Sequence, residues 1–115
     1  MRLIYLAGAY RENEANELFY NIAHGRIRQV DFSKKFKNLV PVLPHVMFLD
    51  IASSRPESYF LEATLEVMMR CDAVWVFDPN WKYSKGTVNE VDIAKSLNIP
   101  VYFLLEDLQY LEDLT

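Results

Sequence analysis

The chain is poor in the residues that build disulfide frameworks and metal centres. Its single cysteine, Cys71, excludes an internal disulfide and a cysteine metal cluster, and it fits a reducing compartment. The two histidines, His24 and His45, lie too far apart in the sequence for a zinc motif. We therefore expect no bound metal.

Long apolar runs are also lacking. No stretch is long enough to span a membrane, and the apolar run near the N-terminus is too short for a signal peptide and is followed by charged residues. These features predict a soluble, cytoplasmic protein with no membrane partner.

Basic residues are outnumbered, with 12 Lys and Arg against 16 Asp and Glu, for a net charge of -4. A sequence-independent nucleic-acid surface requires clustered basic side chains, so we expect no nucleic-acid partner. A small anionic metabolite needs only a local positive site and stays compatible. At 115 residues and 51% hydrophobic composition, the chain is predicted to form a single domain over residues 1–115.

Glycine is scarce, and the segment Gly8-Ala9-Tyr10-Arg11-Glu12-Asn13 lacks two familiar nucleotide signatures. It has neither the glycine spacing of a dinucleotide fingerprint nor the lysine of a P-loop. Redox cofactor binding and triphosphate hydrolysis are accordingly disfavoured, and we expect no cofactor.

Four apolar runs predict strands, at residues 3–7, 39–43, 73–77 and 100–105, and Pro41 predicts that the second lies at a sheet edge or starts late. Helical spacing predicts helices over residues 14–36, 54–70, 87–97 and 108–114. Alternating strands and helices with short connections indicate an α/β domain with a mostly parallel sheet.

Each helix has a predicted buried side. In the first helix it comprises Ala15, Leu18, Phe19, Ile22, Ala23, Ile27 and Val30. The second helix is capped by Ser54 and turns Phe60, Leu61, Leu65 and Met68 inward. The third buries Val88, Val91, Ala94 and Leu97.

Polar and aromatic residues follow the predicted strands where each ends. In an open parallel sheet, ligands bind outside these carboxyl ends, so the residues are expected to share one crevice. They offer N–H and cationic donors for phosphate, rings for a base and carboxylates for a sugar or for catalysis. The predicted site comprises Gly8, Ala9, Tyr10, Arg11, His45, Asp78, Trp81, Tyr83, Ser84, Gly86 and Glu90.

The segment from Ser84 to Glu90 reads as the entry from a strand end into a helix. A hydroxyl residue followed by a glycine lets a ligand approach the N–H groups that the first helical turn leaves unpaired. Glu90 would then place a carboxylate beside this site. A plain capping turn with a solvated glutamate explains the same spacing equally well.

Several segments together resemble the nucleoside 2-deoxyribosyltransferase-like family, and most closely its short microbial and phage members. The resemblance covers residues 3–103. Its segments are Tyr5-Leu6-Ala7-Gly8-Ala9-Tyr10, Pro44-His45, Arg70-Cys71-Asp72-Ala73-Val74-Trp75-Val76 and Ser84-Lys85-Gly86-Thr87-Val88-Asn89-Glu90. It implies a flavodoxin- or Rossmann-like three-layer domain with four to five strands.

The resemblance also implies an activity, cleavage of the N-glycosidic bond of a deoxynucleoside or its monophosphate, with Glu90 as the nucleophile. It matches Arg11 and Ser84 to positions that contact a 5′-phosphate. Because active sites of the family are often completed across a subunit interface, it implies a homo-oligomer.

One position departs from the family pattern. Thr64 stands where the family has an aspartate that handles the proton of the leaving base, so this role would pass to Asp78, His45 or water. Asp78 is as readily explained as a turn residue before Pro79, and His45 as a structural histidine. Asp72, at the start of its strand, is expected at the opposite end of the sheet in a structural role.

Two further functions stay open on the sequence. The segment Gly86-Thr87-Val88-Asn89-Glu90 also resembles the GTxxE segment of cytokinin-activating phosphoribohydrolases, although the paired glycines that precede it there are missing. A non-catalytic nucleotide-binding module is the other alternative, because Thr64 removes a catalytic group.

Overall fold

The structure is a computed structural model that describes residues 1–10 and 15–115. Its sheet has four strands in the order β2-β1-β3-β4, and every neighbouring pair is parallel. The strands are β1 (Arg2–Ala7), β2 (Leu39–Val42), β3 (Ala73–Val76) and β4 (Val101–Tyr102). The predicted α/β class, with a parallel sheet of four to five strands, is confirmed.

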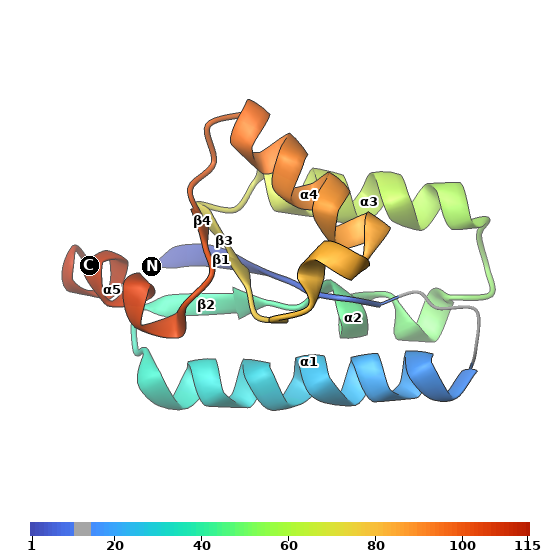
Figure 1. Cartoon of the computed structure of the whole chain (residues 1–115), viewed down its shortest axis with the longest axis horizontal. Helices are drawn as coiled ribbons and strands as arrows, with labels where there is room; N and C mark the ends of the chain where they lie inside the picture. Colours follow the sequence, from blue (N-terminus) through green and yellow to red (C-terminus); the bar gives the residue numbers. More distant parts are fainter. Residues whose placement is uncertain (11–14) are drawn as a thin grey trace.

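Helices cover both faces of this sheet, which makes three layers (Figure 1). On one side lie α1 (Ala15–Lys35) and α5 (Gln109–Asp113), and on the other lie α3 (Glu57–Met69) and α4 (Lys85–Ser96). The remaining short elements are α2 (Pro44–Met47) and the 3-10 turns η1 (Leu49–Ile51), η2 (Trp81–Tyr83) and η3 (Leu105–Leu108).

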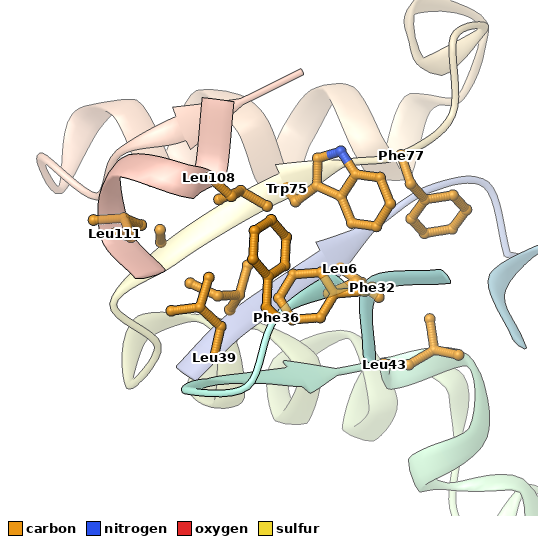
Figure 2. Close-up of a cluster of buried hydrophobic side chains, with 11 residues drawn as sticks. Leu6, Phe32, Phe36, Leu39, Leu43, Trp75, Phe77, Leu108 and Leu111 are labelled. Atoms are coloured by element: carbon orange, nitrogen blue, oxygen red, sulfur yellow. The ribbon is translucent and has the colours of Figure 1, made fainter. Parts of the chain in front are cut away.

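Successive side chains of a strand point to opposite faces, and β1 therefore feeds two cores. Ile4 and Leu6 join the cluster beneath α1 and α5, which Figure 2 shows running along β3 from Leu111 to Phe77. Tyr5 and Ala7 join the cluster beneath α3 and α4. The polar hydroxyl of Tyr5 thus enters an apolar layer, where it requires a partner.

The edges of the sheet match the composition of their strands. β2 lies at one edge, as its proline predicts, because Pro41 cannot donate to a second neighbour. The other edge strand, β4, has two residues where residues 100–105 were predicted to be extended. From Leu105 the chain turns into η3, whose Leu108 is fully buried beneath the sheet.

The first helix is rotated from its predicted orientation. Phe32 and Phe36 are buried, whereas Phe19, Ile27 and Val30 are 70%, 54% and 51% exposed. Apolar residues occupy two sides of this helix, and the prediction took the wrong side for these three positions and for Ala23, which is also exposed. An apolar stripe therefore faces outward along α1.

The second long helix starts later than predicted. α3 begins at Glu57 after Pro56, and the Ser54 hydroxyl donates to the Ile51 carbonyl instead of capping the helix. Phe60 and Met68 are buried as expected, but Leu61 is 51% exposed, so its predicted inward position is wrong. The one-residue step from Phe60 to Leu61 turns a side chain by about 100° around the axis.

Among the described residues, no helix combines the length and apolarity needed to cross a membrane.

Candidate functional site

The central contact of the candidate site joins Glu90 of α4 to Tyr5 of β1. Helix α4 packs over the sheet with Val91 and Ala94 buried, and Glu90, one position before Val91, also points toward the sheet. The Tyr5 hydroxyl donates a hydrogen bond to Oε2 of Glu90. Glu90 is therefore not the solvated glutamate of a plain capping turn.

Burial shapes the ionisation of this pair. It raises the pKa of Glu90 from 4.5 to about 7, against the opposing effect of the hydrogen bond from Tyr5. The pKa of Tyr5 is raised well above its ordinary value, first by burial and then by the charge of Glu90. The phenol therefore keeps its proton, and near neutral pH the carboxyl group changes between its acid and carboxylate forms.

Thr64 of α3 lies beside the same phenol. Its hydrogen bond there lowers the pKa of Tyr5, which is a smaller effect than burial. A neutral hydroxyl thus stands next to the Tyr5–Glu90 pair from a third element of the fold.

The N-terminus of α4 lies six residues before Glu90, at Ser84. Its hydroxyl oxygen accepts from the backbone N–H of Thr87 at 3.3 Å and from the Thr87 hydroxyl at 3.0 Å. Ser84 is the N-cap of α4, which begins two residues before the predicted start at residue 87, and the hydroxyl proton of Ser84 remains available to donate. The first intrahelical bond runs from Val88 N–H to the Ser84 carbonyl, so the N–H groups of Lys85 and Gly86 precede the helical ladder.

Neither the packing nor the backbone conformation at position 86 requires a glycine. A Cβ atom built there meets nothing within 4 Å, and no glycine of the chain has a positive φ. The helix entry therefore opens onto free space at Gly86.

A cavity of about 350 Å³ lies at the carboxyl ends of β1 and β3. Three segments of the chain line this cavity: the residues after β1, the first half of α1, and the connection between β3 and α4. Its lining residues are Ala9, Tyr20, Asn21, His24, Asp78, Pro79, Asn80, Tyr83 and Ser84. Of the predicted site residues, the cavity brings together Ala9, Asp78, Tyr83 and Ser84.

His45 lies behind this cavity and is 1% exposed. Its Nε2 is 2.8 Å from the carbonyl oxygen of Ala9, so Nε2 carries the proton and donates. Burial lowers the pKa of His45 to about 4. A neutral ring that holds the chain after β1 is poorly suited to protonate a leaving base, which makes His45 a structural residue here.

Gly8 and Tyr10 also have packing roles. A Cβ atom on Gly8 would lie 2.3 Å from Cζ of Phe77, so only glycine lets that ring close the end of the core. The Tyr10 ring lies 5.1 Å from the His45 ring, and the Tyr10 carbonyl accepts from Asn21 Nδ2 at 3.4 Å. Arg11 lies outside the described residues.

Asp78 has the turn-forming role that was weighed for it, and it also lies at the cavity. One carboxylate oxygen accepts from Asn80 N–H at 2.8 Å, which forms the turn, and the side chain lines the cavity. Trp81 is elsewhere: its ring packs 5.2 Å from Phe103, and it is not among the cavity residues.

The predicted structural role of Asp72 is confirmed at the opposite end of the sheet. Its Oδ2 accepts from Leu3 N–H at 2.7 Å, and its own N–H donates to the Leu3 carbonyl at 2.8 Å.

Tyr20, Asn21 and His24 line the cavity and were not predicted as site residues. His24 was interpreted as a surface or packing residue, and Tyr20 was not considered. The available signal was a run of polar and aromatic side chains near the start of the helix that follows β1. Using this signal requires knowing how α1 is rotated about its axis, and the apolar pattern predicted that rotation wrongly.

The fold is similar to that of a solved 2-deoxyribosyltransferase from the psychrotolerant bacterium Bacillus psychrosaccharolyticus. The TM-score is 0.59 at 17% sequence identity, over 86% of this chain and 69% of that chain. At this identity the likeness is one of fold. No curated protein matches the sequence. Residues 2–104 match the family described as "Domain of unknown function (DUF7768)".

Proposed function

The chain belongs to the DUF7768 family, whose description names no activity, and we propose from its site that it acts on nucleoside N-glycosidic bonds. The substrate would be a (deoxy)nucleoside or its 5′-monophosphate, and the bond would be hydrolysed or exchanged. The observation that carries the proposal is the Glu90 carboxylate, which is withdrawn from bulk water and held by the Tyr5 hydroxyl.

The proposed reaction uses Glu90 twice, as in retaining glycosidases. A Glu90 oxygen attacks C1′ while the bond from C1′ to the base nitrogen breaks, and the base leaves with the bonding electrons. Water or a second base then attacks C1′ and releases the carboxylate. Tyr5 binds Oε2 and leaves Oε1 for C1′.

The departing base also needs a proton. With His45 neutral and hydrogen-bonded to Ala9, the proposed sources are Asp78, which lines the cavity, and water. Thr64 has no acidic proton to offer. We expect this step to favour bases that leave readily.

The helix entry supports a substrate with a 5′-phosphate. Ser84 and the N–H groups of Lys85 and Gly86 form a set of donors that suits an anion, and Gly86 leaves room for it. Arg11 is proposed as a phosphate partner on the resemblance alone.

Fold similarity adds support, since the similar solved protein is described as a 2-deoxyribosyltransferase. One observation favours a non-catalytic binding module instead: Glu90 is not among the residues that line the cavity. A ligand could then bind without meeting the carboxylate.

The deciding experiment is a chromatographic assay for free base. The purified protein is incubated with nucleosides and 5′-monophosphates of both sugar series, with and without an acceptor base. The proposal is supported if the wild type releases base, Glu90→Gln does not, and the control variant Glu62→Gln, at an exposed position, still does. Absence of base release from every substrate contradicts it, and ribose monophosphates as preferred substrates would indicate the phosphoribohydrolase activity.

We also propose that the protein is a homo-oligomer and acts in the cytoplasm. Ala23, Ile27 and Val30 are exposed on α1 and recur at spacings of four and three residues, the pattern of two packed helices. Such a stripe on a free surface favours contact with a second copy. The single thiol, Cys71, is buried, as suits a protein that forms no disulfide.

A further inference from the structure

The cavity and the Glu90 carboxylate lie in different parts of the fold. Glu90 and Tyr5 meet in the layer beneath α3 and α4, whereas the cavity is walled by α1, on the other face of the sheet, and by the segment from β3 to α4. Ser84 is shared, because it lines the cavity and caps the helix that carries Glu90. The cavity therefore has room for a part of the ligand that does not contact the nucleophile.

Aromatic side chains border the cavity from two elements. On α1, the Tyr20 and His24 rings lie 6.0 Å apart at a tilt of 35°, and His24 in turn contacts Phe77 edge-on at 5.2 Å. Tyr83 of η2 also lines the cavity and is 90% exposed. Exposed rings from two separate elements suit a flat aromatic ligand, which can gain stacking contacts from each.

Two polar side chains of the cavity have spare capacity to accept hydrogen bonds. A carboxylate has lone pairs for about four hydrogen bonds, so Asp78 keeps capacity after accepting from Asn80 N–H. Asn21 is 9% exposed, and its amide NH₂ donates a hydrogen bond to the Tyr10 carbonyl, which leaves its amide oxygen as an acceptor. The ligand that matches these groups brings N–H donors.

The charge of the lining residues also favours a ligand with an N–H donor. Among the nine described lining residues, Asp78 is the only acidic one, and none is Lys or Arg. An anionic group would be repelled by this carboxylate, whereas an amino group would be attracted. A phosphate is better served at the helix entry of α4, where Lys85 and Gly86 supply N–H donors.

We propose that this cavity binds a planar heterocyclic base that carries an exocyclic amino group, stacked between Tyr20 and Tyr83 with the amino group donating to Asp78. The choice of nucleobases among planar heterocycles rests on the proposed function, in which such a base leaves or enters. Adenine, guanine and cytosine have the amino group, whereas uracil and thymine present a carbonyl oxygen at the corresponding place.

Cytosine and uracil form a matched pair of probes, because they differ in an amino group against a carbonyl at C4. Each free base is titrated into the full chain and binding is followed by NMR of the protein or by calorimetry. We expect cytosine to bind about tenfold or more tightly than uracil, since an unpaired or repelled polar group in a site is strongly discriminated.

Asp78→Asn tests the assigned hydrogen bond. The asparagine keeps an oxygen for Asn80 N–H and can present its NH₂ to the cavity, so the preference should shift toward uracil. Tyr20→Ala and Tyr83→Ala should each weaken cytosine binding at least several-fold, because both rings are exposed and their loss leaves the core intact. Tyr110→Ala, which removes an exposed ring on α5, should leave binding unchanged and serves as the control.

Glu90→Gln separates this inference from the proposed reaction. The variant should lose base release and keep the cytosine affinity of the wild type. Cytosine binding without any turnover contradicts the proposed reaction and supports the cavity assignment. Three outcomes would overturn the assignment. The two bases could bind with equal affinity, or neither could bind. Cytosine binding could also be lost in Glu90→Gln and kept in both tyrosine variants.

Discussion

The Tyr5 hydroxyl donates to the Glu90 carboxylate across 85 positions of sequence, and this bond joins the central strand to the helix on its surface. The bond favours the ionised form of Glu90, whereas burial disfavours it, and burial dominates. The protonation state of one partly buried carboxyl group is therefore balanced near neutrality.

Tyr5→Phe removes the donor and should move the pH dependence of the proposed activity. A nucleophilic Glu90 must be ionised, so kcat/KM should rise with pH through a midpoint near 7 in the wild type. Without the phenol hydroxyl the midpoint should move to higher pH, and activity at pH 7 should fall by about tenfold or more. An unchanged midpoint in the pH profile would contradict an effect of Tyr5 on the pKa of Glu90.

Glu90→Gln should stabilise the fold at alkaline pH. The pKa of Glu90 is raised in the folded state, so the unfolded chain ionises first and wild-type stability falls as the pH rises from about 4.5 to about 7. The variant lacks this penalty, which is worth up to about 3 kcal/mol above pH 7. Thermal unfolding of both proteins at pH 4 and pH 8 measures it, and an equal difference in Tm at the two pH values would contradict it.

His45→Gln should make stability less sensitive to acid. Because the pKa of His45 is lowered to about 4, the unfolded chain takes up a proton near pH 6.5 while the folded chain stays neutral. Wild-type stability should therefore fall by up to about 3 kcal/mol between pH 6.5 and 4 from this group alone. Glutamine can still donate to Ala9 and carries no charge, so denaturant unfolding across this range should show a smaller acid loss. Equal slopes would contradict the assignment.

Gly8→Ala and Gly86→Ala form a matched pair with opposite expected results. The alanine Cβ at position 8 overlaps the Phe77 ring, and the misfit should cost about 1–3 kcal/mol or more of unfolding free energy. The same atom at position 86 meets open space and should leave Tm nearly unchanged while it weakens substrate binding at the entry of α4. Partial rescue of Gly8→Ala by Phe77→Leu would identify the clash as the cause.

Ile27→Asp should disrupt self-association without unfolding the chain. The side chain is 54% exposed at the centre of the stripe on α1, so a charge there costs the isolated chain little but is buried in any helix pair. Light scattering after gel filtration should give a lower mass for this variant than for the wild type. Leu104→Asp, at an exposed position outside the stripe, is the control, and a wild type that is already monomeric would contradict the oligomer.

The strands were predictable because their signal is local. Runs such as residues 3–7 and 73–77 are apolar throughout, which is how strands buried on both faces read, and Pro41 alone marks an edge. A capping turn at Ser84 was one of the two interpretations that the sequence left open, because a cap depends on neighbouring residues alone.

The partners of these elements were not predictable, because they depend on rotations and on long-range contacts. α1 has apolar residues on two sides, and only packing decides that Phe32 is buried and Ile27 exposed. That rotation also brings Tyr20 and His24 to the cavity. Nothing in an apolar run reveals that the hydroxyl of Tyr5 meets Glu90, or that Gly8 makes room for Phe77.

The position of β1 in the sheet has a consequence for synthesis. β1 is the first of the four strands to leave the ribosome, yet it lies between β2 and β3, and its pairing with β3 ends at Val76. Until that residue has emerged, one edge of an apolar strand exposes unpaired N–H and C=O groups to other chains. Nascent chains of this protein are therefore expected to need shielding by chaperones until Val76 has emerged from the ribosome.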